Sequence, residues 1–230
     1  MIISLQCFAE DCGYNDYYNF YYTKDVDQVI YDPLQKFNKL SSTINMTLDK
    51  FILEPIALMY EVGVPKFAKA RISDFFDNLS VPISLVNNFL QQDVPSGLYN
   101  FWRFVINLTL GLCGFCDIAS KMGIPESKQT FGNSLAYYGV KPGSYIVLPV
   151  LGSANMRDIV DKFVNGNLLL LKRNASYIVV TTADIIVTRA KLIPFIEQVK
   201  NMSIDQYTTI RSIYYQNRQN EIDKLLSNKK

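Results

Sequence analysis

Two cysteines form the most obvious chemical motif in the chain. Cys113 and Cys116 are spaced C-x-x-C in the stretch GLCGFCDIAS. This spacing is typical of a dithiol redox centre or of half a zinc site. A redox C-x-x-C is expected at the start of a helix that follows a strand, whereas this one follows an apolar helical pattern and lies among glycines. We therefore expect at most a local disulfide there, without a catalytic role, and keep a thiol–disulfide protein as an unfavoured alternative.

The composition removes most other kinds of active site. The 230 residues include no histidine, so Ser–His–Asp and Cys–His centres and histidine-bound zinc are excluded. A four-cysteine zinc site is not expected either, because Cys7 and Cys12 lie in an N-terminal segment without a regular pattern. No carboxylate pair stands out as catalytic. Net charge is only +2 and the basic residues are scattered, which argues against nucleic-acid binding. The composition thus predicts no metal site and makes an enzyme less expected without excluding one.

The elements that would position any site are mostly helical. Asp32 and Pro33 resemble an N-cap and a first helical residue, and apolar residues recur three and four apart from Leu34 to Phe51. Pro55 is expected to interrupt this helix. Further helices are predicted from Pro65 to about 78, after a cap at 80–82, and from 95 to 110.

The second half of the chain is more mixed. Residues 111–125 indicate a glycine-bearing loop with one short turn, and 131–158 a Gly/Pro-rich irregular section with a short strand near 145–148. A short helix is expected at 156–165. Residues 177–182 favour a strand by propensity, and helical patterns follow to the C-terminus with Asp205 as a cap.

The segment 95–110 has an unusual distribution of polarity. Its polar residues Asn100, Arg103 and Asn107 form one narrow stripe on an otherwise apolar helix, the reverse of an ordinary surface helix. Two interpretations remain open. Either the apolar side meets lipid while the stripe faces a polar interior, or the helix is buried in a soluble core with Arg103 paired to a carboxylate. No segment reaches the ~18–20 uninterrupted apolar residues of a membrane span.

The N-terminal region separates from the rest. Residues 1–9 are apolar and are expected to be the remnant of an export signal, with a short apolar arm as the alternative. Residues 10–31 are rich in Tyr, Asp and Asn without a regular period, and we expect a tether. No cysteine there is recognisable as the site of a lipid anchor. The folded domain is predicted at 32–222, followed by a basic tail at 223–230.

Motifs along this domain resemble those of one family in colinear order. The first is the D-P-L-x-x-F-N of Asp32, Pro33, Leu34, Phe37 and Asn38. The others are LDKFILEPIA (48–57), VP (64–65), DNLSVP (77–82), VNNFLQ (86–91), RFVINLTLG (103–111), GFCDIAS (114–120), FGNSLAYYGV (131–140), YIVLPVLGSANMRD (145–158), TRAKLI (188–193) and SIDQYTTIRSIYYQNR (203–218). Together they resemble the MlaA/VacJ family of outer-membrane phospholipid-binding lipoproteins.

The resemblance implies a fold and a function. The fold would be all-α, a single ring-like domain with a central amphiphilic channel, and 177–182 would be helical. The protein would lie in the inner leaflet of the outer membrane, on its periplasmic face. It would pass misplaced outer-leaflet phospholipids to a soluble periplasmic carrier and associate with a trimeric porin. A purely structural porin adaptor is the alternative.

The polar stripe suits the inner wall of such a channel. We therefore expect Asn100, Arg103 and Asn107 to line it, with Arg103 able to meet a lipid phosphate. Asn45, which follows the first family motif, is a second candidate, or else an exposed helix residue. The motif residues expected to hold the structure are Asp32, Pro33, Phe37, Asn38, Gly111, Gly114, Asp117, Phe131, Gly132, Arg157 and Asp158.

Overall fold

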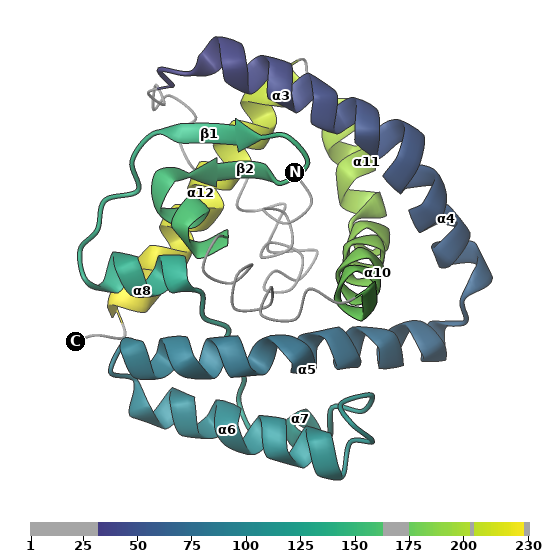
Figure 1. The fold of residues 1–230 in the computed structure, drawn as a ribbon, viewed down its shortest axis with the longest axis vertical. Coiled ribbons are helices and arrows are strands. Elements are labelled where there is room, and N and C mark those ends of the chain that lie inside the picture. The colour runs from purple at the N-terminus through teal and green to yellow at the C-terminus, as the bar shows by residue number, and fades with distance from the viewer. Residues whose placement is uncertain (1–31, 163–174, 203–204, 228–230) are drawn as a thin grey trace. The chain divides into compact units, whose positions relative to one another are not determined.

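The computed structural model describes residues 32–162, 175–202 and 205–227, and these are mostly helical (Figure 1). The predicted all-α class is confirmed, with a single β-hairpin among the described residues. The elements are α3 (Gln35–Leu48), the π-helix η1 (Asp49–Leu53), α4 (Glu54–Gly63), α5 (Lys66–Leu90), α6 (Val94–Thr109), α7 (Ile118–Lys121), α8 (Phe131–Tyr137), β1 (Tyr145–Leu148), β2 (Gly152–Asn155), α10 (Ala175–Lys191), α11 (Ile193–Met202) and α12 (Gln206–Ser227).

The described residues form two compact units, each assembled from separate stretches of chain. Of the described residues, unit 1 takes 32–59, the hairpin segment Gly143–Met156 and the stretches 188–202 and 205–227. Unit 2 takes Tyr60–Pro142 and the described stretches 157–162 and 175–187. The predicted export-signal remnant and tether at 1–31 lie outside the described residues.

Unit 1 is organised around the β-hairpin. Strands β1 and β2 pair antiparallel, with Tyr145 opposite Asn155 and Leu148 opposite Gly152, and α3 lies along β1. The ring of Tyr145 packs among aromatic rings of α12. Residues of α11 and α12 form a second small apolar cluster around Leu192 and Ile213.

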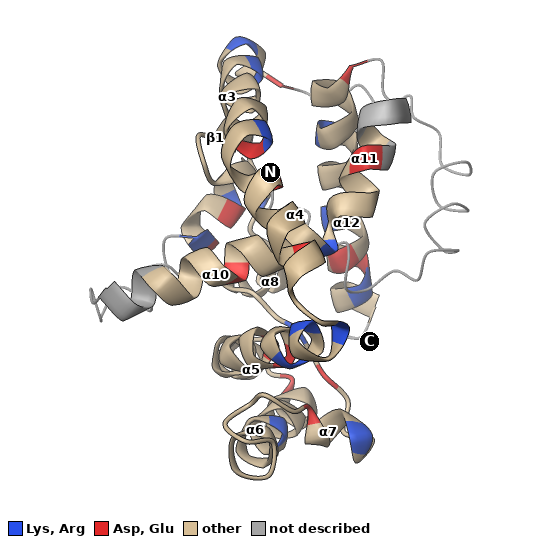
Figure 2. Ribbon diagram, turned by 90° about the vertical axis from the view of Figure 1, so that its right-hand side faces the viewer, with Lys and Arg blue, Asp and Glu red and all other residues tan. Residues whose placement is uncertain are grey.

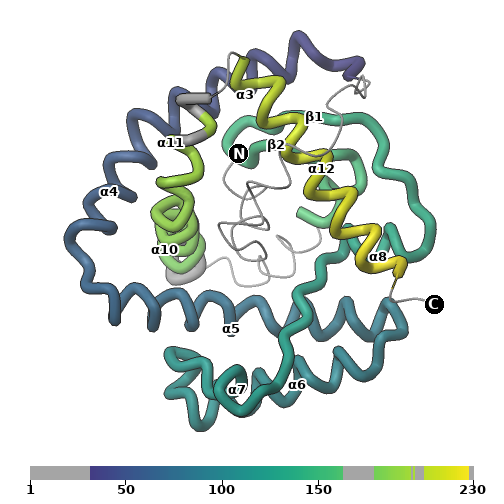
Figure 3. The backbone as a smooth tube through the Cα atoms, turned by 180° about the vertical axis from the view of Figure 1, so that it is seen from behind, coloured from purple at the N-terminus to yellow at the C-terminus, as the bar shows by residue number. Residues whose placement is uncertain are grey.

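Unit 2 is organised around two long helices. Helices α5 and α6 run side by side, as both Figure 1 and Figure 3 show. Asp93 ends the connection between them and caps α6, since its Oδ1 accepts the Ser96 N–H at 3.2 Å. The short helices α7 and α8 pack against α6 and α5 respectively. The loop after α6 therefore returns to the helix pair.

Two prolines do not end a helix where the sequence predicted an end. Pro55 was expected to interrupt the first helix, but the chain passes through the π-turn η1, in which the Glu54 N–H bonds to the Asp49 carbonyl five residues earlier. The wider turn lets the helical path continue to a residue that lacks an N–H. Ser80–Pro82 was expected to cap a new helix. Instead α5 continues through Pro82, because packing along α6 outweighs the local penalty.

The structure differs from the local sequence predictions at three other places. Asp32 does not cap α3, whose N-cap is Leu34 without a side-chain hydrogen bond. The section 131–158, expected to be irregular except near 145–148, also contains α8 and β2. Residues 177–182 are helical, as the family resemblance implied and as strand propensity did not. Residue 156 begins a helix as predicted, described up to 162.

Candidate functional site: a polar interior behind an apolar surface

Helix α3 has its polarity reversed relative to a helix of a water-soluble domain. Its buried residues are polar: Asn38, Ser41, Ser42 and Asn45. The apolar face that the sequence predicted is exposed, and Leu40, for example, is 63% accessible. Phe37 and Ile44 are exposed on the same face. The apolar period is therefore real, but its face is directed outward.

Helix α6 repeats this reversal more strongly. Asn100, Arg103 and Asn107 are almost completely buried, whereas Trp102 is 54% accessible. Arg103 is the only charged residue of α6, which is otherwise uncharged in Figure 2. Ordinary soluble domains rarely expose contiguous apolar patches of this kind. The polar stripe is thus internal, as both open interpretations required.

The buried asparagines of α3 hold the β-hairpin by its backbone. Asn38 donates from Nδ2 to the Tyr145 carbonyl at 3.1 Å and accepts the Val147 N–H at 2.8 Å. Asn45 does the same to the Leu148 carbonyl at 2.9 Å and the Val150 N–H at 2.7 Å. Each carboxamide acts as a substitute peptide group, pairing with one carbonyl and one N–H. We call these contacts the α3 clamp.

The α3 clamp depends on a match between two repeats. Asn38 and Asn45 are seven residues apart, so they share one face of the helix at a separation of about 10.5 Å. The backbone sites that they bind are three residues apart, or about 10 Å along an extended chain. The two side chains therefore fix the register of residues 145–150 along α3. Asn45 is not the exposed helix residue that the sequence left open.

A second clamp is built on α6. Asn100 donates to the Ser127 carbonyl at 2.7 Å and accepts the Ser127 N–H at 3.3 Å. Seven residues on, Asn107 donates to Asp117 at 3.1 Å and accepts the Ala119 N–H at 3.0 Å. We call this set, together with Arg103, the α6 clamp. It fixes the returning loop against the helix.

Arg103 is the charged centre of the α6 clamp. Its Nη2 contacts Asp117 Oδ2 at 2.9 Å, and its Nη1 donates to the Ile124 carbonyl at 2.7 Å and to Ser120 Oγ at 3.0 Å. Glu126 lies farther off, at 4.0 Å. The guanidinium is thus bound to its own loop, in the carboxylate pairing that the sequence left open. A lipid-contacting role for Asn45, Asn100, Arg103 and Asn107 stays a prediction.

The pKa values of two aspartates at the α6 clamp are shifted in opposite directions. Burial pushes the pKa of Asp117 up, but hydrogen bonds from Ser120 and Asn107 and the charge of Arg103 outweigh it, so the pKa is lowered. Burial raises the pKa of Asp74, and neighbouring Asp117 and Asp77 add to the increase against the pull of Arg71. Asp117 is therefore the carboxylate that the clamp favours in its charged form.

The turn that follows α6 requires its glycines. A Cβ on Gly111 would lie 2.3 Å from the Cys116 carbonyl oxygen and 2.4 Å from that of Asn107. Gly114 has a φ of +92°, and a Cβ there would lie 2.6 Å from Asn78 Nδ2. Cys113 and Cys116 are free thiols, without the local disulfide that the sequence allowed at most. The motif thus marks a tight turn.

Asp32 acts across unit 1 and not as a helix cap. It accepts hydrogen bonds from Asn38 at 2.8 Å and from the Tyr207 hydroxyl, and it pairs with Arg211 at 3.1 Å. The first motif is thereby tied to α12. Burial, followed by the hydrogen bond to Asp32, raises the pKa of Tyr207. The exposed Phe37 and Pro33 take no part in this network.

The remaining predicted residues have structural contacts in unit 2. Phe131 begins α8, and the Gly132 N–H donates to Asp161 at 3.2 Å. Arg157 donates to the Val140 carbonyl at 3.1 Å and lies 3.9 Å from Asp158. These contacts agree with a role in holding the structure.

Two features of the site were not predicted. Asn88 on α5 and Gln91, the C-cap residue of α5, are buried polar residues that bind Ser127 and Ser134, and their spacing of three was the available signal. In unit 1, Arg189 donates to both carboxylate oxygens of Asp49, at 2.6 and 2.9 Å. Both residues lie in family motifs, but nothing in the sequence shows that they pair across 140 positions.

The described residues contain neither a membrane-spanning helix nor a metal-binding cluster. No helix within 32–162, 175–202 or 205–227 combines the length and hydropathy needed to cross a bilayer. In the same stretches, His, Cys, Asp and Glu side chains nowhere gather as a group that could hold a metal ion. The two clamps and the contacts around them consist of amides and ion pairs, and the helices that carry the clamps expose apolar residues. These features define a helical protein with buried polar stripes and exposed apolar faces, the arrangement expected next to lipid.

Comparison with known proteins gives the same class of protein. The model of the MlaA lipoprotein family matches residues 30–221, and the chain belongs to that family. A Rickettsia felis protein is 37% identical over 211 residues, which cover 89% of this chain and 84% of the relative. The intermembrane phospholipid transport system lipoprotein MlaA of Escherichia coli K12 is 35% identical over 192 residues, covering 80% and 76%.

A solved structure gives the same result in three dimensions. It was determined to explain how bacterial outer membrane lipid asymmetry is maintained. Its TM-score to this chain is 0.69 at 34% identity, covering 81% of this chain and 96% of the other. The family is one of lipid-transport lipoproteins associated with the outer membrane of Gram-negative bacteria.

Proposed function

We propose that this chain transports phospholipids at the outer membrane, removing them from the outer leaflet and so maintaining lipid asymmetry. The observation that carries the proposal is the reversed polarity of α3 and α6, which bury amides and expose large apolar side chains. In water this arrangement leaves apolar surface unburied, whereas in a leaflet the same surface meets hydrocarbon. Family membership and the names of its relatives support the same function.

The finer parts of the proposal concern placement and partners. We place the chain in the inner leaflet, on the periplasmic face, as a ring with a central channel that lets a headgroup avoid hydrocarbon. Its partners would be a trimeric porin and a soluble periplasmic phospholipid carrier. Because moving a lipid makes or breaks no covalent bond, the protein would not be an enzyme and would need no cofactor.

The single tryptophan gives a direct test of membrane embedding. Trp102 is the only tryptophan in the chain and is exposed on α6. In vesicles that contain brominated phospholipids, its fluorescence should be quenched and shifted to the blue. Leu98→Asp on the same helix should weaken partitioning about ten-fold, since an acidic residue is costly in hydrocarbon. Lys141→Asp, in an exposed loop, is the control and should partition like the unmodified chain.

Transport needs its own measurement. In Gram-negative cells that lack their own family member, phospholipid exposed on the cell surface should fall when this chain is expressed. Unquenched Trp102 together with unchanged surface phospholipid would contradict the proposed function. Quenching without any change in surface phospholipid would leave the chain a membrane-embedded adaptor and not a transporter.

A further inference from the structure

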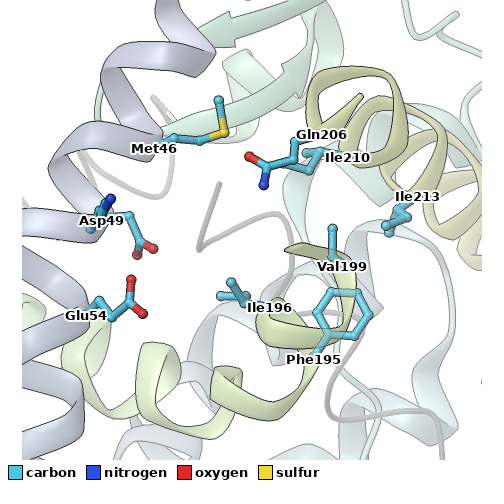
Figure 4. Close-up of a pocket in the computed structure, with 10 residues that line it drawn as sticks. Met46, Asp49, Glu54, Phe195, Ile196, Val199, Gln206, Ile210 and Ile213 are labelled. Carbon is cyan, nitrogen blue, oxygen red and sulfur yellow. The ribbon is translucent and has the colours of Figure 1, made fainter. Parts of the chain in front are cut away.

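The carboxylates that line the cavity of unit 1 are already paired. The cavity holds about 390 Å³, and Asp49 and Glu54 point into it (Figure 4). Both form ion pairs with Arg189, at 2.6 and 3.9 Å. Reactive side chains that neither clamp uses are present in unit 2, where Cys113 and Cys116 belong to the turn after α6.

Helix α5 holds the second half of this turn. The ring of Phe115 stacks on that of Phe75, with the centroids 4.7 Å apart. The Asp117 N–H donates to Asp74 Oδ2 at 3.4 Å. Cys116 lies between these two contacts in the chain, so its backbone is fixed against α5 on both sides.

A guanidinium group lies beside the Cys116 sulfur. A hydrogen bond with Cys116 is the main cause that raises the pKa of Arg71, which also pairs with Asp74 at 3.1 Å. Cysteines that exchange with disulfides are typically found next to cationic groups at partly exposed positions. Cys116 is half-buried in such a place, and Arg71 can stabilise negative charge that develops on its sulfur during exchange.

Cys113 differs from Cys116 in exposure and in backbone conformation. Its side chain is exposed. Its φ is +59° and that of Leu112 is +54°, a region that residues with a Cβ rarely adopt. Such conformations persist only where the surroundings hold them. A covalent link across the turn would favour this conformation, because it restricts the unfolded chain.

The path of the turn is compatible with such a link. The Cys116 N–H donates to the Gly111 carbonyl at 2.9 Å and the Phe115 N–H to the Leu112 carbonyl at 3.4 Å, so the chain reverses here. In a tight turn, Cα atoms three residues apart lie within about 7 Å. A disulfide needs a separation of about 4.4–6.8 Å. The spacing of Cys113 and Cys116 therefore suits a bridge.

We propose that Cys113 and Cys116 are a modification site, closed to a disulfide by exchange with a protein that carries a reactive disulfide. The Cys113 thiolate attacks one sulfur of that disulfide and forms a mixed disulfide, while the other sulfur leaves as a thiolate. The Cys116 thiolate then attacks the Cys113 sulfur, forms the bridge and displaces the second thiolate. The two cysteines lose two electrons and two protons, which the reacting disulfide takes up as it becomes a dithiol.

This inference rests on the proposed function for its compartment, because disulfides form and persist in the periplasm. Exchange takes place on the exported chain before its apolar surface enters the membrane, while Cys113 is in water. The motif is the substrate of the exchange, so the chain itself is not an oxidoreductase.

Oxidation of the purified chain tests the exchange. The full chain carries Cys7→Ser and Cys12→Ser, so that two thiols remain, and is treated in detergent with oxidised glutathione before alkylation and mass spectrometry. We expect the bridge to form with little glutathione adduct. Cys116→Ser should accumulate the adduct on Cys113, and Cys113→Ser should react about ten-fold more slowly, because Cys116 is less exposed. Two thiols that stay free, or adducts that persist while both cysteines are present, would overturn the proposal.

Arg71 provides a test of the second step. Arg71→Met should slow the attack by Cys116, so that the mixed disulfide with glutathione rises about five-fold. Lys66→Met removes an exposed cation of the same helix and should behave like the parent chain. Native circular dichroism in both variants excludes misfolding as the cause. Equal amounts of mixed disulfide in the parent chain and in Arg71→Met would contradict the role given to Arg71.

Thiol trapping in cells separates this inference from the proposed function. In Gram-negative cells that express the chain, alkylation before lysis should find the Cys113–Cys116 bridge in the envelope fraction. Free thiols there, in cells whose surface phospholipid has fallen, would refute the bridge alone. A closed bridge with unchanged surface phospholipid would refute transport and leave the exchange site standing.

Discussion

The α3 clamp and the α6 clamp solve one structural problem with different chemistry. Both place two asparagines seven residues apart, and in both a carboxamide pairs with backbone N–H and carbonyl groups of a distant segment. Asn45 of the α3 clamp bonds only to backbone, whereas the α6 clamp inserts Arg103 between its asparagines and pairs it with Asp117. Neutral amides therefore suffice to set a register behind an exposed apolar surface. The ion pair adds strength and a dependence on pH.

The two clamps also differ in how closely the bound segment approaches the backbone of the helix. The hairpin is held at the length of a side chain, but the turn after α6 touches the end of its own helix at Gly111. Gly111→Ala should therefore have the largest effect, destabilising by about 4 kcal/mol because the methyl group would overlap two backbone oxygens. Thermal unfolding measures it. Gly63→Ala, where a Cβ meets nothing within 4 Å, is the control, and an equal loss in both would contradict the close approach.

Loss of the Arg103 charge should destabilise the α6 clamp more than loss of one asparagine side chain destabilises the α3 clamp. Arg103→Leu removes the positive partner of Asp117 and the side-chain donor to the Ile124 carbonyl, at a cost of about 3 kcal/mol. We expect a lower denaturation midpoint and faster hydrogen exchange in the loop 117–127. The double variant Arg103→Leu, Asp117→Asn should recover part of the loss. A fully stable Arg103→Leu protein would show that the pair is not structural and would favour a lipid-contacting role.

Loss of one amide tests the neutral clamp. Asn45→Ala leaves the Leu148 carbonyl and the Val150 N–H unpaired, which should cost about 2 kcal/mol. Exchange at the Val150 amide should rise with it. The control is Thr43→Ala on the exposed side of α3, which should change stability little. Unchanged protection at Val150 in Asn45→Ala would mean that other contacts of the hairpin set its register.

The smallest expected effect is that of acid pH, which should weaken the α6 clamp and leave the α3 clamp unchanged. The folded-state pKa of Asp117 is lowered, so its contribution to stability is present above the ordinary value of 3.8 and is lost as the pH falls through the folded-state pKa. Exchange at the Ser120 amide, corrected for its intrinsic rate, should therefore accelerate at acid pH, while that at Val150 should not. In Asp117→Asn the pH dependence at Ser120 should flatten. Parallel acceleration at both amides in the native protein would contradict the difference in charge.

Local sequence signals determined much of the helical architecture. The stripe Asn100, Arg103 and Asn107 was visible as a period, and Asp93 and Asp205 cap their helices as side-chain chemistry requires. The missing histidines removed whole classes of enzyme, and colinear motifs indicated the family. These signals are readable because they depend on neighbours within one or two helical turns, where spacing alone fixes the geometry.

Only the tertiary structure decided which face of each helix is inside. The same period describes an apolar face turned toward a core or toward lipid, so α3 could not be oriented from its pattern. Continuation of α5 through Pro82 depends on packing against α6, which outweighs a local penalty. The partners of Asn45, Arg103 and Asp49 lie between 14 and 140 residues away along the chain. Such pairs form because folding brings distant segments together, and local spacing in a single sequence does not predict which segments will meet.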